Sequence, residues 1–370
     1  KGTAELMSIN YKKLPNEVKK GDILKLEDGK KELRVLKTTA TEIFCTVVTG
    51  GILGSRKGIN VPGVDLSISS LTAKDKKDVL FGIKNDVEFI ALSFVQNKND
   101  ILGLRKILNK HKSKSHIIAK IETEAAVRNI DEIIEVSDAI MVARGDMAIE
   151  VGAERVPMIQ KMIIDKCNVV GKPVITATQM LDSMEHSPVP TRAEVSDIAN
   201  AILDGTDAIM LSGETTIGKY PVRAVETMVS IAQRTEPYSK NNDLEYTGLP
   251  HAVTDTLGQA AVRIANEIDA KIIVAITDTG HLARIISRYR PGQALLALAQ
   301  FPETQKRLSL TYGCYSTYLK LDNDIPNISK EIKNLVTKNK WAKKGDRIVV
   351  TAGSPFKSAR NTNTLFIIEI

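Results

Sequence analysis

The sequence predicts an α/β protein with three regions, and three observations lead to this prediction. Residues 1–63 contain short β-type runs interrupted by Gly and Pro, which is typical of a small antiparallel sheet. Over residues 64–237, apolar strands alternate with amphipathic helices, and this alternation predicts parallel β/α units. After a polar linker the strand–helix alternation resumes, so residues 245–370 are expected to form a third, α/β domain.

The first region is expected to be a small β domain. Its predicted strands lie within residues 5–14, 23–39 and 42–48, where β-branched and apolar residues alternate with polar ones. The Gly-rich stretch "GGILGSRKGINVPG" (50–63) follows them and is expected to form a loop.

The second and third regions each have five predicted strands. Two helices of the second region, 156–171 and 190–205, are amphipathic, and Gly205 marks the end of one of them. The strands of the second region are predicted at 88–94, 117–121, 139–143, 173–177 and 208–212. Those of the third region are predicted at 271–276, 294–299, 314–318, 346–351 and 364–369.

Polar side chains recur where successive strands of the second region end, roughly one β/α unit apart. The carboxyl ends of parallel strands form one edge, and β/α barrels and open sheets build their active sites there. Lys120 and Glu122 lie two residues apart, so both leave the same face of their strand. The strand-end residues are Ser93, Lys120, Arg144 to Asp146, Thr178, and Ser212 to Glu214.

These residue types suit metal-assisted chemistry on an anionic substrate. Glu122 and Asp146 can share one hard divalent cation, and Lys120 beside them can stabilise charge on a phosphoryl group or an enolate. Gly145 permits close approach of the backbone to a ligand, and Thr178 offers a hydroxyl that can relay a proton. The alternative is a salt-bridge cluster that caps a barrel; the recurrence at five strand ends favours a site.

Composition excludes several other classes of protein. The formal net charge is +7, but the lysines are scattered among acidic residues, so nucleic-acid binding is not expected. The three cysteines fit no disulfide or zinc spacing, which indicates a reducing, cytoplasmic location. No apolar run approaches the roughly 20 residues of a membrane span, so no membrane association is expected.

Several long motifs resemble the pyruvate kinase family: "IIAKIE", "DAIMVARGDMAIE", "GKPVITATQMLDSM", "GSRKGINVPG" and the stretch from "PVPTRAEVSDIANA" to "GKYPVRAV". The resemblance implies a (β/α)8 TIM-type barrel with an inserted small β domain and a C-terminal α/β domain for effector binding and oligomerisation. It also implies phosphoryl transfer from phosphoenolpyruvate to ADP, giving pyruvate and ATP as the last step of glycolysis. A divalent metal, Mg²⁺ or Mn²⁺, and K⁺ would be the cofactors, and a homotetramer the assembly.

Site roles carried over from the family fall on matching positions. Lys120 resembles the lysine that stabilises the transition state, and Glu122 and Asp146 resemble the metal ligands. Thr178 resembles a catalytic residue, and the phosphoenolpyruvate site would comprise Lys120, Gly145, Asp146 and Thr178. Lys57 is similar to a nucleotide-contacting lysine of the small β domain; alternatively, it is a solvated surface lysine.

The barrel is expected to be partial. The family has eight barrel strands, three of them before the β domain, whereas only five are predicted here. The family's K⁺ ligands on those strands have no counterpart in this chain. We therefore expect a fragment, or a chain whose partner segment is separate, that does not catalyse the reaction alone.

The third domain contains a possible effector site. The turn in "TDTGHLARIISRYRP" could hold the phosphate of a sugar-phosphate or nucleotide, although Asp278 would repel it and Leu282 replaces the usual Ser or Thr. Lys357 and Arg360 on a facing loop are either ligands or exposed charges. The candidate residues of the turn are Thr277, Thr279, Gly280 and His281.

Two rival functions stay open. Metal-dependent aldolases acting on pyruvate also place carboxylates and a metal at a barrel mouth, but they lack the small β domain and "PTRAEVSDIANA". A non-catalytic fragment that only binds a sugar phosphate is the second alternative.

Overall fold

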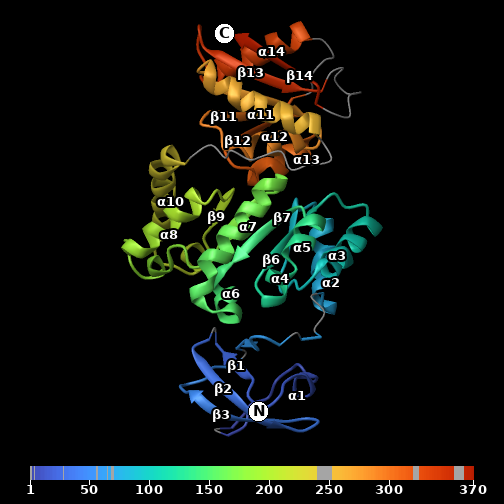
Figure 1. Ribbon diagram of the computed structural model, residues 1–370, viewed down its shortest axis with the longest axis vertical. Helices are drawn as coiled ribbons and strands as arrows, with labels where there is room; N and C mark the ends of the chain where they lie inside the picture. Colours follow the sequence, from blue (N-terminus) through green and yellow to red (C-terminus); the bar gives the residue numbers. More distant parts are fainter. Residues whose placement is uncertain are drawn as a thin grey trace.

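The computed structural model contains three β-sheets that follow one another along the long axis of the molecule (Figure 1). It describes residues 2–3, 5–27, 29–55, 57–64, 66–67, 71–239, 252–319, 325–353 and 362–370. In these residues no helix has both the length and the hydrophobicity needed to cross a membrane. Cys45, Cys167 and Cys314 are free thiols.

The first sheet is antiparallel, as predicted, with the order β3-β2-β1-β4. Its strands are β1 (Ile23–Leu26), β2 (Lys31–Thr38), β3 (Ile43–Thr49) and β4 (Ile59–Asn60). The strand predicted within residues 5–14 is wrong: this segment is irregular and leads into the short helix α1 (Leu14–Glu17). Pro15 in the first turn of α1 fixes a helical φ, and Leu14 and Pro15 are buried beneath the sheet.

The second sheet has five parallel strands in sequential order, β5-β6-β7-β8-β9. Sequential order brings all five carboxyl ends to one edge, as expected for a β/α barrel arc. Among the strands that the structure describes, β5 and β9 each have one neighbour. The strands are β5 (Phe89–Leu92), β6 (His116–Ile121), β7 (Ala139–Ala143), β8 (Val174–Ala177) and β9 (Ala208–Met210).

Helices between these strands cover the outer face of the sheet (Figure 1). In α3, Ile101, Leu104 and Leu108 recur at helical spacing and are fully buried against the sheet. The helices of this region, from the one before β5 to those after β9, are α2 (Ala73–Lys84), α3 (Lys98–Lys110), α4 (Glu124–Arg128), α5 (Ile130–Val136), α6 (Arg144–Val151), α7 (Val156–Val170), α8 (Arg192–Leu203), α9 (Gly213–Thr216) and α10 (Pro221–Thr235).

The third sheet has the order β12-β11-β10-β13-β14, in which only β14 is antiparallel to its neighbour. Helices α11 (Ala252–Glu267) and α12 (His281–Ser287) pack on one face, and α14 (Ile325–Lys338) packs on the other. The remaining elements are α13 (Pro302–Arg307), β10 (Ile272–Thr277), β11 (Ala294–Ala299), β12 (Cys314–Tyr318), β13 (Arg347–Ala352) and β14 (Thr364–Glu369).

Polar contacts join neighbouring sheets. Lys25 Nζ donates to the carbonyl of Ile149 at 2.8 Å, and Asn60 Nδ2 donates to Glu150 Oε1 at 3.2 Å. Because α6 carries Ile149 and Glu150 and directly follows β7, the first sheet lies at the carboxyl edge of the second. On the other side, the buried Arg290 pairs with Asp207 at 3.0 Å. The domain boundaries 1–63, 64–237 and 245–370 stay predictions.

Candidate functional site

The ends of β5 and β6 are joined by a polar chain. Lys120 is the penultimate residue of β6, and its Nζ lies 2.6 Å from Glu122 Oε1. The same ammonium donates to Ser93 Oγ, just beyond β5, at 2.8 Å. The Glu122 side chain is 1% exposed and that of Lys120 is 24% exposed, so the ammonium lies between a buried carboxylate and the open edge of the sheet.

Glu122 is held in place by the backbone as well. The amide of Phe94 donates to Oε2 at 2.7 Å, and Phe94 adopts the left-handed conformation (φ 51°) that directs this amide toward the carboxylate. Burial raises the pKa of Glu122, whereas the Lys120 and Phe94 hydrogen bonds lower it. The charge of Asp146 also raises the pKa of Glu122, so the two carboxylates are within electrostatic range of each other.

The two carboxylates fit a divalent metal. Glu122 Oε1 is buried, and no described donor other than the Lys120 ammonium lies against it. A buried carboxylate oxygen without a regular hydrogen bond, next to a second carboxylate, is suited to a hard cation. Among the described residues, no group of three or more His, Cys, Asp and Glu could hold a metal. Two carboxylates are nevertheless enough for Mg²⁺, which keeps water and substrate oxygens as its other ligands.

Thr178 and Gly145 join the ends of β7 and β8. The amide of Gly145, in the first turn of α6, donates to Thr178 Oγ1 at 2.8 Å, and this hydroxyl donates to the carbonyl of Ala177 at 2.6 Å. A Cβ at position 145 would lie 3.4 Å from Thr178 Oγ1, so glycine permits this close approach. The Gly145 amide, which we expected to face a ligand, is therefore occupied by the Thr178 hydroxyl.

Arg144 has a structural role that the sequence did not reveal. It is 8% exposed; its Nη1 pairs with Asp197 Oδ1 at 2.6 Å, and its Nη2 donates to the carbonyl of Thr178 at 2.7 Å. Thr178 has φ 69°, which is strained for a β-branched residue. Arg144 thus stabilises the strained backbone that presents the Thr178 hydroxyl.

The end of β9 does not contribute an open charge to this edge. Glu214 is 2% exposed and accepts hydrogen bonds from the amides of Leu181, at 2.9 Å, and Ser212, at 2.6 Å. Its carboxylate therefore joins the loops after β8 and β9. We use "strand-end cluster" below for the residues at the other strand ends: Ser93, Lys120, Glu122, Gly145, Asp146 and Thr178.

Lys57 lies on the loop before β4 of the first sheet. Its Nζ is 3.1 Å from Glu27 Oε1, and its side chain is 43% exposed. Hydrogen bonds from Lys31 and Lys57 lower the pKa of Glu27 to about 2. Because the first sheet contacts α6, Lys57 belongs to the part of the molecule at the same edge as the strand-end cluster (Figure 1).

The predicted effector turn follows β10. Its amides are already bonded: Gly280 N donates to Thr277 Oγ1 at 2.9 Å, and His281 N donates to Thr279 Oγ1 at 3.3 Å. Leu282 belongs to α12 and is buried in the core between this helix and the sheet. Lys357 and Arg360 lie outside the described residues, so the effector site stays a prediction.

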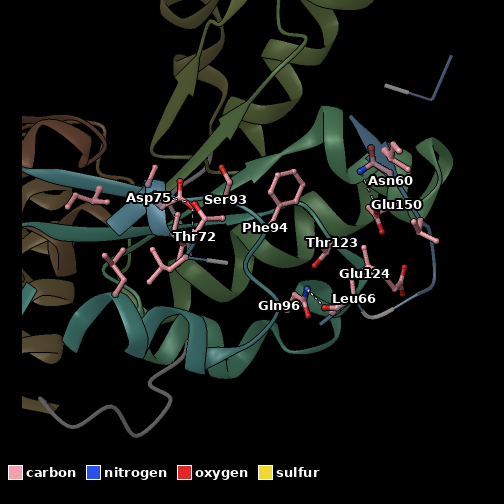
Figure 2. A pocket seen from close by; sticks show the side chains of 18 of the residues that line it. Asn60, Leu66, Thr72, Asp75, Ser93, Phe94, Gln96, Thr123, Glu124 and Glu150 are labelled. Carbon is pink, nitrogen blue, oxygen red and sulfur yellow. Dashed lines mark hydrogen bonds between the residues drawn. The ribbon is translucent and has the colours of Figure 1, made fainter. Parts of the chain in front are cut away.

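A cavity of about 720 Å³ adjoins the strand-end cluster (Figure 2). It lies between β4 and the outer side of β5, and most of its wall is apolar. Figure 2 shows Ser93 beside Thr72 and Asp75 at one end of this cavity and the Asn60–Glu150 hydrogen bond at the other, with Phe94 and Thr123 between them. Lys120 and Glu122 do not line it, so the cavity is a neighbour of the cluster and not its binding pocket.

Family models identify the relatives of this chain. A model described as "Pyruvate kinase, barrel domain" matches residues 1–225, and one described as "Pyruvate kinase, alpha/beta domain" matches residues 255–368. The chain belongs to the pyruvate kinase family. The predicted family and the predicted α/β fold class, a partial TIM-type barrel with a C-terminal α/β domain, are thereby confirmed.

Individual relatives agree with the family models. A pyruvate kinase of Geobacillus stearothermophilus is 43% identical over 370 residues, covering 98% of this chain and 63% of the relative. A pyruvate kinase of Clostridium acetobutylicum is 42% identical over 373 residues, covering 98% of this chain and 78% of the relative. The crystal structure of a pyruvate kinase from Cryptosporidium parvum matches with a TM-score of 0.89 at 36% identity, covering 97% of this chain and 74% of that chain. The chain spans less than two thirds of the length of the first relatives, 63% and 64%.

Proposed function

We propose that this protein takes part in phosphoryl transfer from phosphoenolpyruvate to ADP, which yields pyruvate and ATP. The observation that carries the proposal is the strand-end cluster, in which contacts run from Ser93 through Lys120 to Glu122, and from Gly145 to Thr178. The family relationship supplies the reaction, and the cluster supplies the side chains that the reaction needs.

Glu122 and Asp146 would hold the divalent metal, Mg²⁺ or Mn²⁺. When bound, the metal would neutralise negative charge on the phosphoryl group and on the enolate oxygen. Lys120 would face the phosphoryl group from the end of β6, where its ammonium would stabilise negative charge that increases in the transition state. The buried contacts of Glu122 with Phe94 and Lys120 orient the carboxylate before any ligand binds.

Thr178 would help deliver a proton to the methylene carbon of the enolate. The hydroxyl would give its proton to that carbon, directly or through a water molecule, and would be reprotonated from solvent. In the free protein this proton is donated to the Ala177 carbonyl, so the hydroxyl must rotate away from that acceptor. Gly145 N–H would continue to donate to Thr178 Oγ1 and orient it.

Lys57 would contact the nucleotide from the first sheet. Its ammonium would leave Glu27, with Lys31 remaining as the partner of that carboxylate. K⁺ dependence and the homotetramer rest on the family resemblance alone. A sugar-phosphate or nucleotide effector rests on that resemblance and on the turn after β10, and a cytoplasmic location rests on the cysteine pattern as well.

The test is the formation of ATP from phosphoenolpyruvate and ADP with Mg²⁺ present. The 370-residue chain is assayed alone and together with a segment that supplies three further β/α units beside β5 and β9. We expect ATP formation when the additional units are present and none when the metal is chelated. Phosphoenolpyruvate binding without ATP formation in both preparations would favour the non-catalytic alternative, and cleavage of a pyruvate-derived aldol would favour the aldolase.

A further inference from the structure

The third sheet carries a second cavity, of about 1130 Å³, at the amino ends of its strands. It begins where β10 and β11 start, at Ile272 and Ala294, and extends to Tyr315 of β12 and the segment after α14. Thr277, at the opposite end of β10, belongs to the predicted effector turn. The cavity is therefore distinct from that turn and from the strand-end cluster.

The floor of this cavity is one face of the sheet. Ile272 pairs with Ala294, and Leu296 pairs with Tyr315, in the parallel register of β10, β11 and β12. Residues paired in register, and residues two apart on one strand, share a face. This is the face on which α14 packs, so the cavity opens where α14 ends and no longer covers the sheet.

Two exposed aromatic side chains border the cavity. Tyr315 is 64% exposed and Trp341 is 37% exposed, and both line it. Aromatic side chains left open at the edge of a cavity can stack on a planar ring of a ligand.

The cavity is also lined by more cations than anions. Lys271, Lys340, Lys343 and Lys344 line it, against Asp269 and Asp346. Within the described residues, no salt bridge is formed by any of the four lysines. Asp346 is partly engaged, because its Oδ2 accepts the backbone amide of Lys343 at 2.8 Å.

The segment after α14, which carries Lys340, Lys343 and Lys344, has a fixed backbone. The amide of Trp341 donates to the carbonyl of Val336 at 2.9 Å, and the amide of Lys340 donates to the carbonyl of Thr337 at 3.0 Å. The amide of Asp346 donates to the carbonyl of Lys343 at 3.0 Å. These bonds occupy carbonyls at the end of α14 that would otherwise repel an anion, and they hold Lys340, Trp341 and Lys343 on one short connection between α14 and β13.

We propose that this cavity binds a nucleoside phosphate, with the base stacked on Trp341 and Tyr315 and the phosphates against the lysines. Its volume is sufficient, since small-molecule sites are typically about 300–1,000 Å³. The combination of two aromatic faces with several unpaired ammonium groups suits a ligand that has both a ring and phosphates, and suits inorganic phosphate or a free nucleoside less well.

Trp341 itself reports on this site, because it is the only tryptophan in the sequence. Its fluorescence is measured in metal-free buffer while ATP, tripolyphosphate or adenosine is added to the 370-residue protein. We expect a saturable change in fluorescence with ATP. The Kd for ATP should be at least about tenfold lower than the Kd for tripolyphosphate, which lacks the stacking base, and the Kd for adenosine, which lacks the phosphates. No change with ATP, or equal affinity for tripolyphosphate, would overturn the proposal.

Variants separate this site from general attraction of anions. Lys340→Ala/Lys344→Ala should weaken ATP binding by about tenfold or more. The control Lys330→Ala/Lys333→Ala removes two lysines from α14 that do not line the cavity and should leave the affinity unchanged. Equal weakening in both double variants would overturn the proposal.

Calorimetry with Trp341→Phe and Trp341→Ala tests the stacking contact without relying on the indole signal. The aromatic variant should retain ATP binding and the alanine variant should lose it, with circular dichroism confirming that both are folded. Retained affinity in Trp341→Ala would contradict the stacking role.

Discussion

Replacing Lys120 by Met should destabilise the second sheet as well as lower activity. Glu122 is 1% exposed, and the Lys120 ammonium at 2.6 Å is the only described partner against its Oε1. Removing one partner of a buried pair costs about 3–5 kcal/mol, because the other charge is left uncompensated. The Phe94 amide still donates to Oε2 and Lys120 is 24% exposed, so we expect the lower limit, about 3 kcal/mol.

The second substitution in this test removes the uncompensated charge. Lys120→Met/Glu122→Gln should recover about 2 kcal/mol of the loss, because the amide has no charge to compensate. Native-state hydrogen exchange of the β6 amides is the suitable assay. A chain with several sheets need not unfold in one step, and exchange measures the stability of the second sheet by itself. Activity, assayed with the additional β/α units present, should behave differently: kcat should fall by about 10²–10³ in Lys120→Met while KM for phosphoenolpyruvate changes little, and it should not recover in the double variant, which also lacks a proposed metal ligand. Unchanged exchange in Lys120→Met, or a double variant no more stable than the single one, would refute this reasoning.

Three further predictions concern individual residues. With the additional β/α units present, Asp146→Asn should reduce activity by orders of magnitude with an unchanged circular dichroism spectrum, because one of two metal-binding carboxylates is lost; near-normal turnover at ordinary Mg²⁺ would remove the assignment. Thr178→Ala should slow the exchange of pyruvate methyl protons with solvent along with turnover, and unaltered exchange would leave Thr178 only a binding role. Burial lowers the pKa of His116 from 6.5 to about 4, so below pH 6.5 the unfolded chain binds a proton that the folded chain does not. The free energy of unfolding should therefore fall by up to about 3 kcal/mol as the pH is lowered from 6.5 to 4. His116→Gln should remove this contribution to the pH dependence of the urea-unfolding midpoint, and the same pH dependence in the variant would contradict the shifted pKa.

The strands of the second and third sheets could be predicted from the sequence because buried parallel strands are short, nearly continuous apolar runs. Residues 139–143, 294–299 and 364–369 were predicted with the bounds that the structure has. The predicted strand at 208–212 ends at Met210 instead, because Ser212 already begins the loop in which Glu214 is buried.

The strand predicted within residues 5–14 failed for a local reason. Apolar and polar residues alternate there, but α1 begins at Leu14, with Pro15 in its first turn. The Tyr11 hydroxyl donates to Glu17 Oε1 at 2.8 Å, so this side chain packs within the segment and not against a neighbouring strand. The pattern could not reveal that this segment pairs with none of the strands that the structure describes.

The roles of the candidate site residues stay predictions, and their hydrogen bonding was not predictable from the sequence. Strand-end spacing and family motifs point to Lys120, Glu122 and Asp146, because both depend only on positions along the chain. The Arg144–Asp197 ion pair joins residues 53 positions apart, and the strained φ of Thr178 depends on that arginine. Such contacts form only when the loops after β7 and β8 come together, and no short-range pattern encodes them.

The central claim is that Glu122 and Asp146 bind the metal, and the most direct measurement is the titration of the protein with Mn²⁺ by electron paramagnetic resonance. Wild type should bind Mn²⁺ at one site, and Glu122→Gln and Asp146→Asn should each weaken that binding by about tenfold or more. Glu150→Gln is the matched control, since Glu150 is also a carboxylate near Asp146 but hydrogen-bonds to Asn60. Unchanged Mn²⁺ affinity in Glu122→Gln and Asp146→Asn, or an equal loss in Glu150→Gln, would contradict the assignment.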